Sequence, residues 1–224
     1  MPVAAVVIPG PACADEADWR RLSDAPDAAP DAATRRPLPA ADAPSSHAEA
    51  LRRWTSAEAM AGWLGAHFEY DATRALALSE TARQARPADA THTIHTPEAF
   101  FARPRGICVD LAHFAVATLR QIEPQAQAAY LMIEFEPVQI AGQLLRRHWL
   151  AAFQRDGRHF FVADSKRPGH LAGPCASVEQ FLADYAAYRG RPIVAHRLLA
   201  SHQRQLRRQA PRALRTDAAP DPAL

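Results

Sequence analysis

Residues 105–120 read Arg-Gly-Ile-Cys-Val-Asp-Leu-Ala-His-Phe-Ala-Val-Ala-Thr-Leu-Arg, and their apolar side chains recur at helical spacing. Gly106 precedes the periodic run, so Cys108 falls in the first turn of the predicted helix. The unpaired backbone N–H groups and the dipole of that turn favour an anion, and we expect them to lower the pKa of the Cys108 thiol toward the reactive thiolate. The alternative is that Cys108 is a small buried residue on the apolar face of the helix.

The composition around this helix is that of a globular protein. The chain has 224 residues, of which 48% are hydrophobic and 22% charged, and this size predicts one domain. No apolar run approaches the ~18 residues that a membrane helix needs, so we expect no membrane partner. The net charge of +2 is too small to indicate a nucleic-acid partner.

The composition changes along the chain and predicts three regions. Residues 1–46 are rich in Ala, Pro and Asp, and we expect them to be disordered because they cannot bury enough apolar surface. Residues 47–199 are expected to form the folded domain, and residues 200–224 an Arg-rich tail. We interpret the tail as solvated, with binding of an acidic partner as the alternative. Three cysteines favour a cytoplasmic protein, although an apolar N-terminal run before Ala12-Cys13-Ala14 leaves secretion open.

Capping signals and periodicity predict helices first and strands later, which favours an α+β fold with an antiparallel sheet. One helix follows the capping box Thr55-x-x-Glu58, a short one starts at Thr96-Pro97, and another runs from Ser177 to Gly190. Strands are expected at residues 128–135, 149–153, 160–163 and 193–199.

His148 and Asp164 flank a predicted hairpin and can supply a base and its orienting group for Cys108. If Asp156-Gly157 forms a two-residue type I′ turn, Asp164 points to the opposite side of the sheet from His148. If the turn has three residues with a bulge at Gly157, the two side chains lie opposite each other on one face. We predict the bulged turn.

These residues, in this order, resemble the transglutaminase-like superfamily, in particular its bacterial cysteine peptidase and amidase type. The resemblance covers about residues 55–170 and rests on Arg105–Ala112, Leu119-Arg120, His148-Trp149 and Asp164-Ser165. It implies a papain-like α+β core in which a Cys-bearing helix packs on an antiparallel sheet. It also implies that Cys108 is the nucleophile, His148 the general base and acid, and Asp164 the residue that orients the imidazole. The chain contains no Asn, so a Cys-His-Asn triad is excluded.

The expected function is cleavage or transfer of an amide or isopeptide acyl group, through a thioacyl intermediate on Cys108. We expect a protein or peptide substrate and neither a cofactor nor a metal. One oxyanion donor would be the Cys108 backbone N–H, and Tyr70 is a candidate for the second. Ile107 and Val109 depart from the residues that flank the cysteine of the crosslinking transglutaminases. The alternative is therefore a catalytically silent binding module, which a Cys108 sealed under side chains would favour.

Overall fold

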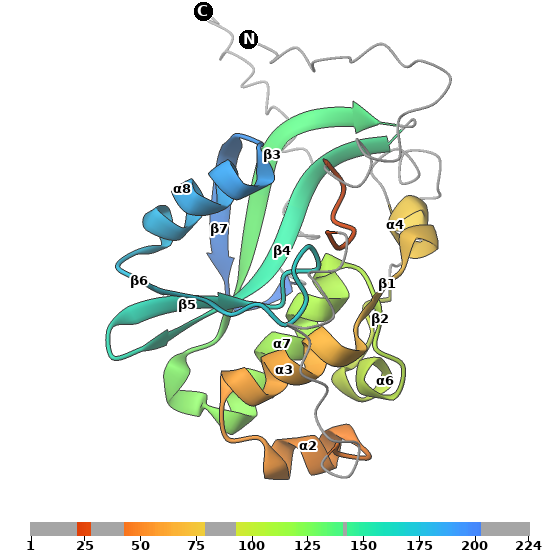
Figure 1. Ribbon diagram of the computed structural model, residues 1–224, viewed down its shortest axis with the longest axis vertical. Helices are drawn as coiled ribbons and strands as arrows, with labels where there is room; N and C mark the ends of the chain where they lie inside the picture. Colours follow the sequence, from red (N-terminus) through yellow and green to blue (C-terminus); the bar gives the residue numbers. More distant parts are fainter. Residues whose placement is uncertain (1–21, 28–42, 79–92, 141–142, 203–224) are drawn as a thin grey trace, which may run out of the picture.

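The computed structural model describes residues 22–27, 43–78, 93–140 and 143–202, and it shows a mixed fold of helices and an antiparallel sheet (Figure 1). The five-stranded sheet has the order β6-β5-β4-β3-β7. Its strands are β3 (Ala129–Ile140), β4 (Gln143–Arg155), β5 (Arg158–Val162), β6 (Ala172–Cys175) and β7 (Ile193–Leu199). The predicted α+β class is confirmed in this sense.

Most helices cover one face of the sheet. They are α2 (His47–Arg53), α3 (Ala57–His67), α6 (Pro97–Ala102) and α7 (Cys108–Ile122), followed by the 3-10 turn η2 (Pro124–Ala126). Their apolar faces meet β4 in a core where Trp63 stacks on Phe101 with ring centroids 4.5 Å apart. Helix α8 (Val178–Arg189) covers the other face, so the sheet lies between two helical layers (Figure 1).

A second, two-stranded sheet lies beside the start of α7. Strand β1 (Glu69–Tyr70) pairs in parallel with β2 (Arg105–Gly106), which ends two residues before Cys108. Helix α4 (Ala72–Leu78) follows β1 directly. This small sheet brings Tyr70 next to the helix that carries Cys108.

The helix-capping predictions are confirmed at two helices and wrong at one. Thr96 caps α6, and Ser177 caps α8, which ends at Gly190 in the left-handed conformation. The expected capping box at Thr55 does not form, because α3 starts after Ser56. The Ala57 N–H at this helix start instead donates to a carboxylate oxygen of Glu123 at 2.6 Å.

The predicted bulged turn between β4 and β5 is wrong. Arg155 pairs with Arg158, and the two residues between them, Asp156 and Gly157, have φ angles of 51° and 70°. Two consecutive positive φ angles define a type I′ turn, whose twist matches that of the flanking strands, and Asp-Gly is among its preferred sequences. The strand expected at residues 149–153 is also longer than predicted, because β4 extends from Gln143 to Arg155 and includes His148.

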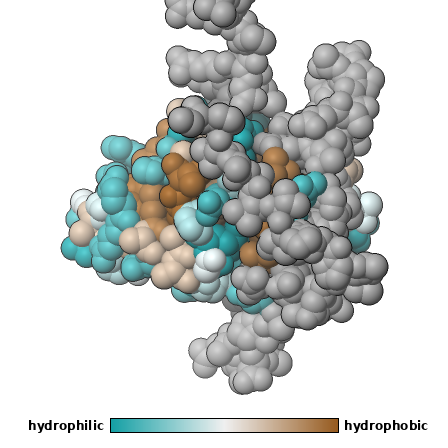
Figure 2. Space-filling view, turned by 90° about the horizontal axis from the view of Figure 1, so that it is seen from above, coloured by the Kyte–Doolittle hydropathy of each residue, from teal (hydrophilic) through white to brown (hydrophobic). Residues whose placement is uncertain are grey.

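The surface of the described residues carries both hydrophobic and hydrophilic side chains. Seen from above, an apolar area lies among hydrophilic side chains (Figure 2). The exposed large apolar side chains among the described residues are Tyr188, Val194 and Leu198, and single apolar residues of this kind are common on soluble domains. None of the described helices has the length and apolar character needed to cross a membrane.

Candidate active site

Cys108 is the first residue of α7, and Asp110 fixes the conformation of the chain just before it. The buried Asp110 carboxylate accepts hydrogen bonds from the backbone N–H of Ile107 at 3.1 Å and of His95 at 3.0 Å. Arg74 of α4 donates two further bonds to it, at 2.9 and 3.0 Å. Gly106 is required here, because a Cβ at this position would lie only 2.9 Å from the Cβ of Asp110.

His148 lies on the face of β4 that is covered by α8. Its ring stacks on Tyr185 with centroids 6.0 Å apart, and its Nε2 lies 3.0 Å from Oδ1 of Asp164. Strand β5 ends at Val162, which pairs with Ala151, so among the described residues β4 has no strand partner on this side at His148. At this open edge, Sγ of Cys108 lies within 4.8 Å of a ring nitrogen of His148. The structure thus brings together the three residues that the sequence singled out.

Asp164 reaches His148 although the type I′ turn alone would turn it away. Continuing the β4–β5 register would pair Asp164 with Trp149, on the face opposite His148. Ala163, however, has a φ of 66°, and it interrupts the strand geometry directly before Asp164. The neighbours Val162 and Ala163 consequently both pack into the same core cluster, which a regular strand does not allow.

The turn after Ala163 is fixed by α8 and by α3. Oδ1 of Asp164 also accepts hydrogen bonds from the Lys166 backbone N–H at 2.9 Å and from the Tyr185 hydroxyl at 3.1 Å. Gly169 of the same turn lies against Gly65 of α3 so closely that a Cβ on Gly169 would be 2.6 Å from the Gly65 Cα. These contacts hold the carboxylate that lies against Nε2 of His148.

A fourth residue, Asp24, lies in the site and was not predicted from the sequence. Its Oδ1 is 3.1 Å from Nδ1 of His148 and 2.9 Å from Nη2 of Arg189 in α8. It belongs to the described stretch Leu22–Asp27, coloured red in Figure 1, which lies beside β4. No signal in the sequence pointed to Asp24, because the surrounding segment has the composition of a disordered one.

Asp24 changes the protonation expected at Cys108. Burial and the Asp24 carboxylate raise the pKa of the Cys108 thiol, although contacts with His148 and with the Trp149 backbone act in the opposite direction. The expectation of a lowered thiol pKa is therefore wrong for this arrangement. Burial would lower the pKa of His148, but Asp24 and Asp164 outweigh it and raise that pKa well above its ordinary value. The two carboxylates therefore favour the protonated form of His148, and the surroundings of Cys108 favour its neutral thiol.

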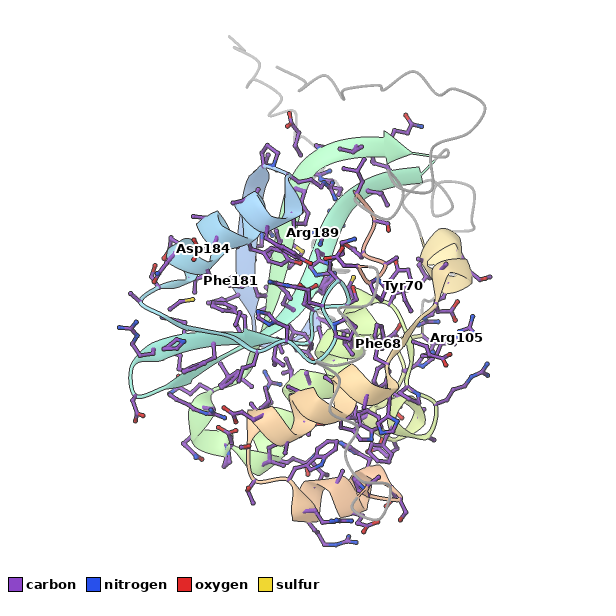
Figure 3. All side chains as sticks on the ribbon, in the orientation of Figure 1. Phe68, Tyr70, Arg105, Phe181, Asp184 and Arg189 are labelled. Atoms are coloured by element: carbon purple, nitrogen blue, oxygen red, sulfur yellow. The ribbon has the colours of Figure 1, made fainter. Side chains whose placement is uncertain are left out.

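Tyr70 approaches the same group from the side of β1. Burial raises its pKa, and the charges of Asp24 and Cys108 add to the effect, so its hydroxyl keeps its proton. Figure 3 shows Tyr70 on the side of β1 and Arg189 on the side of α8. A protonated hydroxyl in this position can donate a hydrogen bond to a negatively charged oxygen.

Asp24, Cys108 and His148 also have the donor types of a metal site. Among the described residues they form the one such cluster, with ligand atoms within 4.8 Å of one another. The Asp24 oxygen that faces His148 is, however, bound by the Arg189 guanidinium, a cation that would repel a divalent ion. We therefore interpret the cluster as an ion-paired one.

The comparisons with known proteins agree with the geometry. A family model described as a transglutaminase-like domain matches residues 48–174. Neither the curated proteins nor the solved structures gave a match. The matched range includes Cys108, His148 and Asp164, while Asp24 lies before it and Arg189 after it.

Proposed function

The chain belongs to the transglutaminase-like domain family, and on that premise we propose that it is a cysteine enzyme that cleaves or transfers an amide or isopeptide acyl group. The observation that carries the proposal is the meeting of Cys108, His148 and Asp164 from three separate parts of the chain. We also propose that α7 and the sheet form a papain-like core. The Cys108 helix start packed at the edge of β4 supports this assignment.

In the proposed reaction, the substrate displaces the Asp24 carboxylate, which favours the charged form of His148, and the imidazolium gives its extra proton to solvent. The neutral imidazole then takes the proton of the Cys108 thiol while Sγ attacks the acyl carbon. The backbone N–H of Cys108 and the hydroxyl of Tyr70 bind the oxyanion. The imidazolium of His148 then protonates the leaving nitrogen, the C–N bond breaks, and a thioester remains on Cys108. Water, or a second amine, attacks the thioester while His148 takes its proton and returns it to the sulfur. Asp164 keeps the ring oriented throughout, through Nε2.

A catalytically silent binding module is the second candidate, and one observation favours it. Cys108 and His148 are only 7% and 0% exposed, so the thiol is sealed. The residues that cover the site include Asp24, which belongs to a short separate stretch of chain and not to the sheet or to α7. A sealed thiol in this chain is therefore compatible with an enzyme whose site is covered.

The two candidates differ in whether Cys108 turns over an activated acyl group. We expect 4-nitrophenyl acetate to acetylate Cys108, as detected by mass spectrometry, and to be hydrolysed with turnover. Cys108→Ser should abolish both, and His148→Ala should lower the rate at least about a hundredfold, because the general acid and base is lost. Cys175→Ser, which removes the other described cysteine, should leave both unchanged. Turnover that persists in Cys108→Ser, or acetylation without turnover in the wild type, would contradict the enzyme proposal.

A further inference from the structure

Leu22–Asp27 is bound through its main chain by residues from two parts of the fold. The Ser165 hydroxyl donates to the carbonyl of Asp24 at 2.8 Å, and the backbone N–H of Asp27 donates to the carbonyl of Lys166 at 3.0 Å. Two guanidinium groups bind the other end, because Arg189 donates to the Ser23 carbonyl and Arg191 to the Leu22 carbonyl, both at 3.1 Å. Contacts of this kind bind a peptide backbone without depending on its side chains.

The two acidic side chains of the stretch meet two buried cations. Asp24 binds Arg189, and Asp27 binds Nζ of Lys166 at 2.8 Å and the hydroxyl of Tyr188. The side chains of Arg189 and Lys166 are 0% and 3% exposed. A cation that a bound segment buries is costly unless a carboxylate of that segment neutralises it, so acidic groups favour the binding of a segment here. The three-residue spacing of Asp24 and Asp27 fits the two cations.

The surface that binds Leu22–Asp27 extends beyond these six residues. A cleft of about 260 Å3 lies between α8 and residues 167–175, and its lining includes Tyr188, Tyr185 and Arg167. Arg167 stacks over the Tyr188 ring at 3.8 Å. Because Tyr188 contacts both Asp27 and this cleft, a peptide longer than Leu22–Asp27 could extend into it.

We propose that Ser165, Lys166, Tyr188, Arg189 and Arg191 form a binding site for an acidic peptide, and that Leu22–Asp27 fills this site and thereby blocks Cys108. The inference rests on the proposed function, since the blocked group is the proposed nucleophile. The Asp24 carboxylate occupies the space beside Sγ and Nδ1 into which the carbonyl of any substrate must enter.

Alkylation of Cys108 by iodoacetamide, followed by mass spectrometry of its peptide, measures the blockade without requiring turnover. We expect Asp24→Ala and Asp27→Ala to accelerate alkylation by about tenfold or more, because each removes a charged contact of Leu22–Asp27. Glu179→Ala is the control, since this exposed carboxylate of α8 lies near His196 and His159, and its rate should equal that of the wild type. Asp27 lies outside the proposed catalytic group, so Asp27→Ala tests the blockade even if Asp24→Ala does not fold.

A peptide added in trans tests the acidic specificity. In the double variant Asp24→Ala/Asp27→Ala, the acetylated and amidated hexapeptide Leu-Ser-Asp-Ala-Pro-Asp should protect Cys108 from iodoacetamide. Its matched control, Leu-Ser-Ala-Ala-Pro-Ala, should not. Equal protection by both peptides, or by neither, would overturn the acidic site.

The outcomes separate this inference from the proposed function. Faster alkylation in Asp24→Ala and Asp27→Ala, together with no turnover of 4-nitrophenyl acetate by these same variants, would keep the acidic site and refute the enzyme. Cys108-dependent turnover, with alkylation at the wild-type rate in both Asp24→Ala and Asp27→Ala, would keep the enzyme and refute the blockade.

Discussion

Asp110 shapes the start of α7 from within the protein. Its carboxylate is fully buried, and it neutralises Arg74 while it accepts the N–H of Ile107, the residue before Cys108. Breaking a buried pair leaves the remaining charge uncompensated, which costs far more than losing an exposed pair. The position of Cys108 therefore depends on a residue that does not react.

We predict that Asp110→Asn lowers the free energy of unfolding by about 3 kcal/mol, as measured by urea denaturation. The control is Glu58→Gln, because Glu58 forms a similar two-pronged pair with Arg155, but its side chain is 54% exposed. Its cost should stay below about 1 kcal/mol. Equal costs for the two substitutions would show that burial of the Asp110 pair contributes nothing.

The end of β5 decides where Asp164 lies, through the conformation of Ala163. We predict that Ala163→Val displaces Asp164 and lowers the pKa of His148, which NMR titration of the imidazole would detect, because a β-branched residue is strained at a φ of 66°. Ala163→Gly should leave that pKa unchanged. Ala151→Val is the matched control, since it adds the same volume to the same core cluster within regular β4. A shift of the His148 pKa of the same size in Ala151→Val would attribute the effect to volume and not to backbone conformation.

Periodic segments were predictable, and the deviations from regular structure were not. Cys108 and His148 lie in a helix and a strand whose apolar repeats are plain in the sequence, and β7 was expected at residues 193–199, where it lies. Ala163 gives no signal, since alanine ordinarily avoids the left-handed region. Asp24 gives none either, because its position depends on Arg189 and His148, which lie far from it in the chain. Local pattern and the family resemblance thus pointed to Cys108, His148 and Asp164, but they indicated neither the strand register nor the segment that covers these residues.

The network that joins Leu22–Asp27 to α8 and the sheet makes the stability of the protein depend on pH. The groups around the His148 imidazole are the carboxylates of Asp24 and Asp164, the thiol of Cys108, the hydroxyl of Tyr185 and, through Asp24, the guanidinium of Arg189. Burial opposes the ionisation of Asp24, but His148 and Arg189 outweigh it and hold the pKa of Asp24 below 3.8, its ordinary value. Its contribution to stability is thus present above pH 3.8 and is lost as the pH falls below that value.

His148 makes the free energy of unfolding depend on pH in the opposite direction. Its pKa in the folded protein lies well above 6.5, its ordinary value, so its contribution is fully present below pH 6.5 and is lost as the pH rises through the folded pKa. We therefore predict that the free energy of unfolding falls as the pH rises above 6.5, and that Asp24→Asn makes this fall shallower. It does not abolish the fall, because Asp164 still faces the imidazole. Urea denaturation between about pH 5 and about pH 9 measures the slope.

The experiment is best done with Cys108→Ser as the parent, because the thiol, whose pKa is also raised, would otherwise add its own alkaline slope. Asp27→Asn is the matched control, since it removes a carboxylate of the same stretch that binds Lys166 and not His148. It should lower stability at every pH and leave the slope of the parent unchanged. If Asp24→Asn keeps the parent's slope as well, Asp24 is not the charge that holds the proton on His148, and the ion pair between Leu22–Asp27 and the site does not form in solution.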